Sequence, residues 1–260
     1  GLYLSRYSDN KEAPTLSDYF ETPEEAVRHY GYLKQVYQSI SAKEVYSSYV
    51  FPWDCVVLTR SDVVLKMAYI AWMTNDIRLR EELCTYLPAL ESYNRASYIG
   101  IVLARTESKV EQEYVLQSLG DRSADIADEA YKVLSEMSLS PEQYQHIEEL
   151  LRFKYSEMRI NAINLLMKQP EAQLAASIRR LLSDKNAERR LAGLDMMKSI
   201  RNVDFLKDSY QKLLSTVREI QKPNAKEKIL IESLIGDGTE QSPTSNYTRE
   251  KWLRAIRSGA

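Results

Sequence analysis

The side chains that most often carry out catalysis or bind metals are few in this chain, and they stand far apart. There are two histidines, His29 and His146, and two cysteines, Cys55 and Cys84. Neither histidine has a recognisable spacing to a cysteine, as a nucleophile and its base would need. Two cysteines give neither a disulfide framework nor a metal-ligand spacing. No Gly-rich phosphate loop, GxSxG turn or HExxH helix occurs. The sequence therefore favours a protein without catalysis, metal or other cofactor, and the free thiols favour a cytoplasmic location.

Arginines are the remaining candidates, because their charge could hold an acidic partner. The candidate binding residues are Arg159, Arg179, Arg180 and Arg189. One interpretation is a basic row on one face of the protein. The other is that guanidinium groups bridge neighbouring helices and hydrogen-bond to Asp184 or to helix ends. For Arg159 and Arg190 we expect the second, because their spacing alone predicts it.

The elements that would position these arginines repeat along the chain. The segment Leu181–Met197 reads LLSDKNAERRLAGLDMM, and a similar segment lies thirty-one residues upstream. The matching pairs include Leu150 with Leu181, Arg159 with Arg190, Ala162 with Gly193, and Leu166 with Met197. A weaker copy lies about thirty-two residues earlier still. A fixed period near thirty with helix–turn–helix content is typical of a solenoid.

This pattern resembles the HEAT-repeat family, whose units carry an aspartate in the turn, an arginine six residues later and then a small residue. Asp184, Arg190 and Gly193 stand at that spacing, and Arg159 with Ala162 repeats its second half. The resemblance implies an all-α fold, an α-α superhelix or solenoid of antiparallel helix pairs. HEAT arrays share a fold and differ widely in function, so the resemblance indicates architecture more than activity.

The repeats also predict a core. We expect the positions buried between consecutive helix pairs to be Ile163, Leu165, Leu182, Leu194 and Met197. Gly193 falls on the same helix stripe, where a missing side chain costs about 1 kcal/mol of helix propensity. A residue this small is expected there if another helix crosses closely.

Local signals divide the chain into four parts. We expect an irregular lead-in over 1–21, a HEAT-like repeat domain over 22–235, a linker over 236–247 and a C-terminal helix over 248–260. Thr22, followed by Pro23 and Glu25, predicts a firm helix start. Ser41 and Glu44 form a second capping box, which predicts a short helix to about Val50. No strand is expected.

Charge and tyrosine are unevenly distributed. The net charge is −2, but residues 1–150 hold 24 acids against 14 Lys and Arg, whereas residues 151–260 hold 13 acids against 21 bases. Twelve of the 18 tyrosines lie in the first hundred residues. The charge asymmetry indicates a binding surface or merely solvated helix faces, and the tyrosines suit either an interface or mixed packing.

Solenoids commonly hold other macromolecules on an extended surface. The leading hypothesis is therefore a non-catalytic interaction scaffold that binds a protein partner, as a whole protein or as a segment of a longer one. No run approaches the roughly eighteen apolar residues of a membrane span, so no membrane is expected.

The alternative is a nucleic-acid-binding protein, in particular a HEAT-like DNA alkylpurine glycosylase. That family uses an aromatic cleft, a carboxylate and basic residues, and Trp53-Asp54 and Trp72 with Asp76 offer aromatic–carboxylate pairs. The residues that could face phosphates are Arg78, Arg80, Arg159 and Arg190. Against this alternative, a DNA-binding protein should show a concentrated basic footprint, whereas this chain has a net charge of −2.

Overall fold

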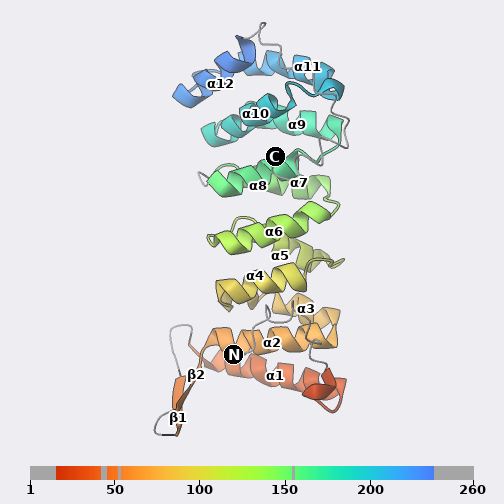
Figure 1. Ribbon diagram of the computed structural model, residues 1–260, viewed down its shortest axis with the longest axis vertical. Helices are drawn as coiled ribbons and strands as arrows, with labels where there is room; N and C mark the ends of the chain where they lie inside the picture. The colour runs from red at the N-terminus through yellow and green to blue at the C-terminus, as the bar shows by residue number, and fades with distance from the viewer. Residues whose placement is uncertain (1–15, 42–45, 52–53, 154–155, 237–260) are drawn as a thin grey trace. The chain divides into compact units, whose positions relative to one another are not determined.

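The computed structural model describes residues 16–41, 46–51, 54–153 and 156–236 (Figure 1). The C-terminal helix expected over 248–260 lies outside these residues, as does the expected linker after Gly236 and the lead-in up to residue 15. The chain divides into two compact units, unit 1 over residues 1–133 and unit 2 over residues 134–260. Each unit is described by itself.

The regular structure is almost entirely helical, which confirms the predicted all-α class. Unit 1 contains η2 (Leu16–Asp18), α1 (Pro23–Ser39), β1 (Tyr46–Phe51), β2 (Asp54–Leu58), α2 (Arg60–Thr74), α3 (Ile77–Leu83), η3 (Leu87–Ala89), α4 (Ser92–Ile101), α5 (Lys109–Ser118) and most of α6 (Ala124–Glu136). Unit 2 contains α7 (Pro141–Leu150), α8 (Ser156–Leu166), α9 (Glu171–Leu182), α10 (Ala187–Ile200), η4 (Asp204–Leu206), α11 (Lys207–Arg218) and α12 (Ala225–Ile235).

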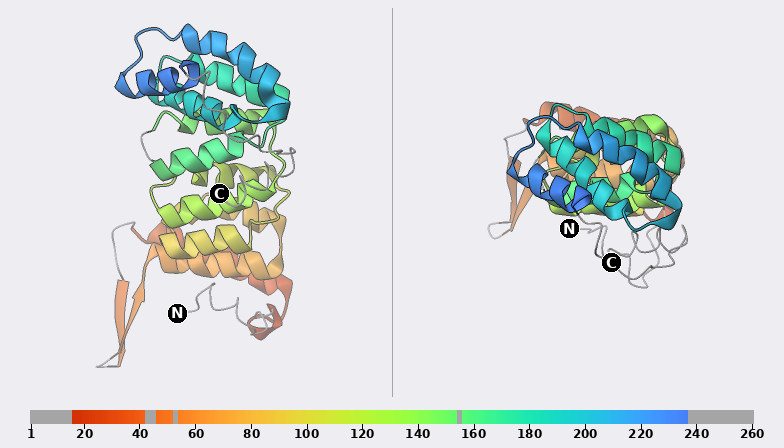
Figure 2. Two further views of the ribbon diagram at one scale, coloured as in Figure 1. Left: turned by 45° about the horizontal axis from the view of Figure 1, so that its top comes forward. Right: turned by 90° about the horizontal axis from the view of Figure 1, so that it is seen from above.

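A β-hairpin interrupts the helices of unit 1. Strands β1 and β2 pair antiparallel, with Tyr46 opposite Leu58 and Ser48 opposite Val56, and Figure 2 shows the hairpin projecting from the helices of this unit. The short helix predicted from Ser41 to about Val50 is therefore wrong, and so is the expectation of no strand. The residues after the capping box are mostly tyrosine, valine and phenylalanine, whose β-propensity outweighs a helix-start signal.

The helix starts were predicted well where a cap has a clear side-chain acceptor. The Thr22 side chain accepts a hydrogen bond from the Glu25 backbone N–H and begins α1. Asn224 forms a complete capping box with Glu227 and begins α12. Such caps satisfy backbone N–H groups that have no partner within their own helix.

In unit 2 the core follows the predicted stripe with one correction. Leu165, Leu182, Leu194 and Met197 are buried as expected. Ile163 is only half-buried, so its predicted burial is wrong. The buried stripe of α8 runs through Ala162, Leu165 and Leu166, which are also buried, and Ile163 is turned about 100° from Ala162 around the helix.

Gly193 lies where α10 meets α9. A Cβ atom at Gly193 would stand 3.1 Å from Leu182 Cδ2 and 3.2 Å from Leu181 Cβ. This close approach confirms the expectation that another helix crosses at the glycine.

Candidate interaction site

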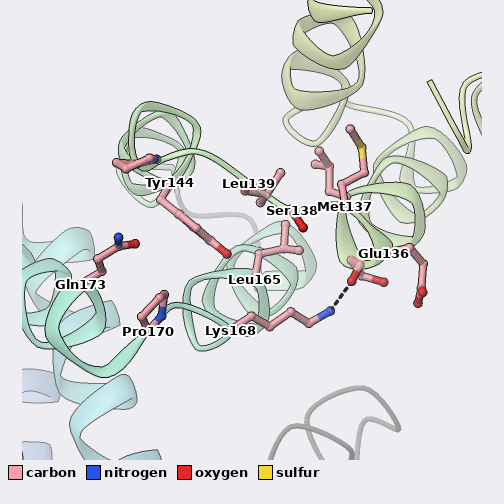
Figure 3. A pocket seen from close by; sticks show the side chains of 12 residues that line it. Glu136, Met137, Ser138, Leu139, Tyr144, Leu165, Lys168, Pro170 and Gln173 are labelled. Carbon is pink, nitrogen blue, oxygen red and sulfur yellow. Dashed lines mark hydrogen bonds between the residues drawn. The ribbon is translucent and has the colours of Figure 1, made fainter. Parts of the chain in front are cut away.

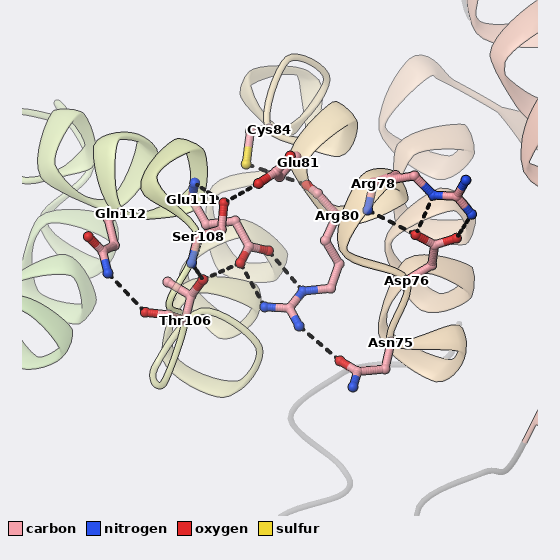
Figure 4. A network of polar contacts seen from close by, with 10 residues as sticks. All are labelled: Asn75, Asp76, Arg78, Arg80, Glu81, Cys84, Thr106, Ser108, Glu111 and Gln112. Atoms are coloured by element: carbon pink, nitrogen blue, oxygen red, sulfur yellow. Dashed lines mark hydrogen bonds and ion pairs between the residues drawn. The ribbon is translucent and has the colours of Figure 1, made fainter.

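A buried ion pair joins α3 to α5 in unit 1 (Figure 4). Arg80 donates from Nε and Nη2 to the two carboxylate oxygens of Glu111 at 2.8 and 2.7 Å. Glu111 is fully buried, and its carboxylate also accepts a hydrogen bond from the Thr106 hydroxyl. The third Arg80 nitrogen, Nη1, donates to Asn75 Oδ1 at 2.9 Å, in the turn before α3. Every strongly polar group of this pair therefore has a partner, as a buried charge requires.

The same kind of contact recurs within unit 2. Arg159 on α8 donates to the Glu188 carboxylate and backbone carbonyl at the start of α10, and to Asp195 Oδ2 at 2.7 Å. Arg190 on α10 donates from Nε to Glu227 Oε1 at 2.7 Å, at the start of α12. In each case an arginine reaches an acid in the first turn of the next helix but one. Acids are favourable there because the helix N-terminus carries partial positive charge.

Arg190 also holds the turn that precedes its own helix. Its Nη1 donates to the backbone carbonyls of Asp184 and Lys185 at 3.0 and 2.9 Å. The predicted contact with Asp184 is confirmed, although the acceptor is the main-chain oxygen. We call the three contacts Arg80–Glu111, Arg159–Glu188 and Arg190–Glu227 the arginine ladder.

Two of the candidate binding arginines converge on one buried acid. Glu148, only 2% exposed, accepts from Arg180 Nε and Nη2 at 3.1 and 2.6 Å. Arg189 Nη2 lies 4.0 Å from the same carboxylate, and its Nη1 pairs with Asp184 at 2.8 Å. The hydrogen bond with Glu148 raises the pKa of Arg180. A partner that used these two guanidinium groups would have to displace carboxylates.

The other two candidate arginines differ from each other. Arg159 belongs to the arginine ladder, whereas Arg179 is exposed and has no ion pair within the described part of the chain. The structure therefore brings Arg180 and Arg189 together and leaves Arg179 separate. That these arginines bind a partner stays a prediction.

The residues considered for a glycosylase site have local structural partners. Asp76 caps α3 and accepts from Arg78 Nε and Nη2 at 3.2 and 2.9 Å, which holds the pKa of the Asp76 carboxyl below its usual value. Arg80 is committed to Glu111. The Trp53 side chain lies outside the described residues.

The cysteine and histidine side chains do not form a dyad in the described residues. The Cys84 thiol is buried and donates to the Arg80 carbonyl at 3.5 Å. Burial, with the nearby Glu111 and Glu81 carboxylates, raises the pKa of Cys84 to about 12. The thiol is therefore protonated at neutral pH and is a poor nucleophile. No group of three or more His, Cys, Asp or Glu side chains in the described ranges could hold a metal ion.

Two surface cavities have walls that include charged and polar side chains. The one in Figure 3 has a volume of about 410 Å³ and lies in unit 2, where Tyr144 and Leu165 line it and Lys168 donates to the Ser135 carbonyl at 2.9 Å. A cavity of about 330 Å³ in unit 1 is lined by Tyr93 and by acids of α6, including Asp125. Charged side chains, among them Lys168 in one cavity and Asp125 in the other, lie in these walls, so we interpret both cavities as crevices between helices.

One cavity in unit 1 is different because its walls are apolar and aromatic. It has a volume of about 360 Å³ and lies between α1, α2 and the segment that follows η2. We call it the α1–α2 cavity, and its lining residues are Tyr19, Phe20, His29, Leu33, Lys66, Tyr69, Ile70 and Met73. Only His29 and Lys66 among them carry or can gain a positive charge, and none of the described lining residues is an acid.

The rim of the α1–α2 cavity exposes large side chains. Tyr19 is 52% exposed, and Tyr32, which follows on α1, is 60% exposed. The His29 ring lies between Phe20 and Tyr32, with centroid distances of 5.2 and 6.2 Å. These rings, from three places in the sequence, form a continuous aromatic edge.

Sequence reasoning missed this cavity. It placed Tyr19 and Phe20 in an irregular lead-in and gave His29 and Lys66 no role. The available signal was the adjacent aromatic pair just before the Thr22 cap, followed by His29 and Tyr32 on one face of α1. An aromatic pair before a capped start, followed by aromatic rings at i and i+3 on the helix, is the pattern that could have indicated an interface.

The comparisons with other proteins place the chain in a family. A family model described as Family of unknown function (DUF5724) matches residues 1–250, and the chain belongs to this family. Searches of curated proteins and of solved structures found no match. None of the described helices is long and apolar enough to cross a membrane.

Proposed function

We propose that the chain is a non-catalytic interaction scaffold, a HEAT-like solenoid of antiparallel helix pairs that binds a protein partner. The arginine ladder supports the repeat architecture, because equivalent positions, Arg159 and Arg190, make equivalent contacts with the next helix but one. Each of these contacts ties a helix to the next helix but one through buried or half-buried charges. Such a framework favours a fixed surface rather than a moving catalytic site.

The α1–α2 cavity is the observation that carries the binding function. A 360 Å³ cavity with apolar walls and an exposed aromatic rim is costly to leave in water. Tyrosine is also enriched at protein interfaces, where its large ring contributes contact area and its hydroxyl can stay hydrated. The exposed Tyr19 and Tyr32 rings fit this role.

The test is photocrosslinking in the native host. A benzophenone amino acid is placed at Tyr32, and in a second strain at Ile229, which is 66% exposed on α12. We expect a discrete protein adduct from position 32 and a weaker, diffuse pattern from position 229. Equal patterns from both positions, or no adduct from position 32, would contradict the proposed site.

A further inference from the structure

The α1–α2 cavity has dimensions and walls that define what it can hold. Its volume of about 360 Å³ lies at the lower end of the range for ligand sites, roughly 300–1,000 Å³. Leu33, Ile70 and Met73 supply aliphatic and thioether surface, and Phe20 adds an aromatic wall. Thioether and aromatic groups both make favourable contacts with a ring. The space therefore fits one large apolar side chain with part of its neighbour.

The described residues that line the cavity include basic side chains and no acid. Lys66 is exposed, and none of the ion pairs seen in the described residues involves it. His29 uses Nδ1 in a contact with the Glu25 carbonyl at 3.3 Å, which leaves Nε2 for a ligand.

Two acids that lie one turn before His29 and Lys66 on their helices are engaged elsewhere. Glu25 Oε2 accepts from the Glu21 backbone N–H at 2.8 Å. Asp62, one turn before Lys66, accepts from the Thr59 amide and hydroxyl at 2.8 and 2.7 Å. Among the residues that the structure describes, no carboxylate forms an ion pair with the Lys66 ammonium at the cavity edge.

We propose that the α1–α2 cavity binds a short acidic–apolar peptide segment of a partner protein: a large apolar side chain enters the cavity and a neighbouring carboxylate pairs with Lys66. The proposal rests on the proposed scaffold function and names its partner's chemistry. An aromatic anchor beside a carboxylate satisfies both the apolar walls and the unpaired cation. His29 Nε2 adds a second hydrogen-bonding group on the same rim.

The charge contact selects among peptides more than it drives binding. An exposed ion pair contributes little by itself in water, and the apolar anchor supplies most of the affinity. Reversing the Lys66 charge replaces attraction by repulsion, so we expect affinity for an acidic peptide to fall about tenfold. A peptide with the same anchor and a basic neighbour should gain affinity in the same variant.

The experiment selects peptides from a display library of random twelve-residue sequences against the full 260-residue protein. Four proteins are compared: the wild type, Lys66→Glu, the control Lys228→Glu on an exposed face of α12, and Leu33→Trp, which fills the cavity. The wild type and the control should enrich peptides with Asp or Glu within two residues of Phe, Trp or Leu. Lys66→Glu should exchange that preference for Lys or Arg, and Leu33→Trp should enrich neither.

Each other result overturns the inference in a distinguishable way. Apolar anchors without an acidic preference, or the same peptides from Lys66→Glu and the wild type, would refute the role of Lys66 while leaving a protein-binding cavity. If the wild type enriches no peptide but position 32 still gives a protein adduct, a folded protein surface binds there and a short peptide does not. An adduct of twice the chain mass would identify the bound protein as a second copy of this chain. No enrichment and no adduct would remove both the inference and the proposed function. Circular dichroism spectra equal to the wild type show that the variants are folded.

Discussion

Removing the Arg190 guanidinium tests whether the arginine ladder holds unit 2 together. In the native protein the Arg190 side chain is 15% exposed and the Glu227 side chain is fully buried. Arg190→Ala removes the 2.7 Å contact to Glu227 and both hydrogen bonds to the Asp184 and Lys185 carbonyls. The two carbonyls lie beside solvent in an exposed turn and can bind water instead. The Glu227 carboxylate cannot do so without an opening of the helix contact.

The magnitude follows from the charge that is left behind. Removing one partner of a buried ion pair costs about 3–5 kcal/mol, because the other charge stays desolvated. Glu227 keeps the hydrogen bond from the Asn224 backbone N–H at 2.6 Å, so the lower end applies. We expect Arg190→Ala to lower the free energy of unfolding of unit 2 by about 3 kcal/mol. In a Glu227→Gln background, Arg190→Ala should lower the free energy of unfolding by only about 1 kcal/mol, because no buried charge is left without a partner.

Amide hydrogen exchange over α10 and α12, read by mass spectrometry, measures the local free energy of opening. The matched control is Arg179→Ala, which removes an exposed guanidinium from α9 and should cost under about 0.5 kcal/mol. The reasoning from the unpaired Glu227 carboxylate is refuted if Arg190→Ala lowers the free energy of opening no more than Arg179→Ala does. It is also refuted if Arg190→Ala lowers that free energy equally in the wild-type and the Glu227→Gln backgrounds. A loss of partner binding at unchanged stability would instead assign Arg190 to a binding surface.

Three further predictions test the core and the titratable groups. Leu194→Ala at a fully buried position should lower the free energy of unfolding by about 2–5 kcal/mol, whereas Ile160→Ala, where the side chain is 57% exposed, should change urea melts little. In a Cys55→Ser protein, Cys84 should resist iodoacetamide at pH 7 until urea unfolds the chain, because its pKa is raised to about 12; labelling of the folded protein would contradict its burial. Burial raises the pKa values of Cys84 and Tyr98 above their ordinary values of 9.0 and 10.0. Above about pH 9 the unfolded chain therefore loses protons that the folded chain keeps, and stability must fall with rising pH. Thermal melts between pH 8 and 11 should show a falling midpoint, and a constant midpoint would argue against these shifts.

The features that the sequence predicted are those set by neighbours along the chain. The Thr22 cap depends on Thr22 and Glu25, three positions apart, so a short stretch of sequence determines its geometry. Gly193 was interpreted correctly because the absence of a side chain in an apolar helix stripe has few explanations. The burial of Leu194 followed from helical periodicity in the same way.

The features that the sequence did not predict depend on contacts that local patterns do not contain. Ser41 and Glu44 have the residue types of a helix start, yet the chain continues into β1, because strand pairing with β2 is a non-local gain. Arg180 on α9 and Arg189 on α10 both lie beside Glu148 on α7. A comparison of repeated sequence segments does not detect such a contact between three helices. The α1–α2 cavity likewise exists only once α1 packs against α2.

The charge asymmetry of the sequence changes meaning once the pairs are known. A division at residue 150 counts Glu148 and Glu149 with the acidic half, but they pair with Arg180 and Arg189 of the basic half. Counted by unit, residues 1–133 carry 20 acids against 14 bases, and residues 134–260 carry 17 acids against 21 bases. The net charges of the two parts therefore change from −10 and +8 to −6 and +4.

A nucleic-acid backbone would have to replace carboxylates already bound to these arginines, and each exchange would return little free energy. An exposed cation that no described carboxylate pairs with, such as Lys66 at the α1–α2 cavity, should give a partner more attraction than a paired arginine does. Salt should largely screen that attraction beyond a Debye length of roughly 8–10 Å. We therefore expect the local position of such a cation, more than the net charge of either half, to decide which partner the surface favours.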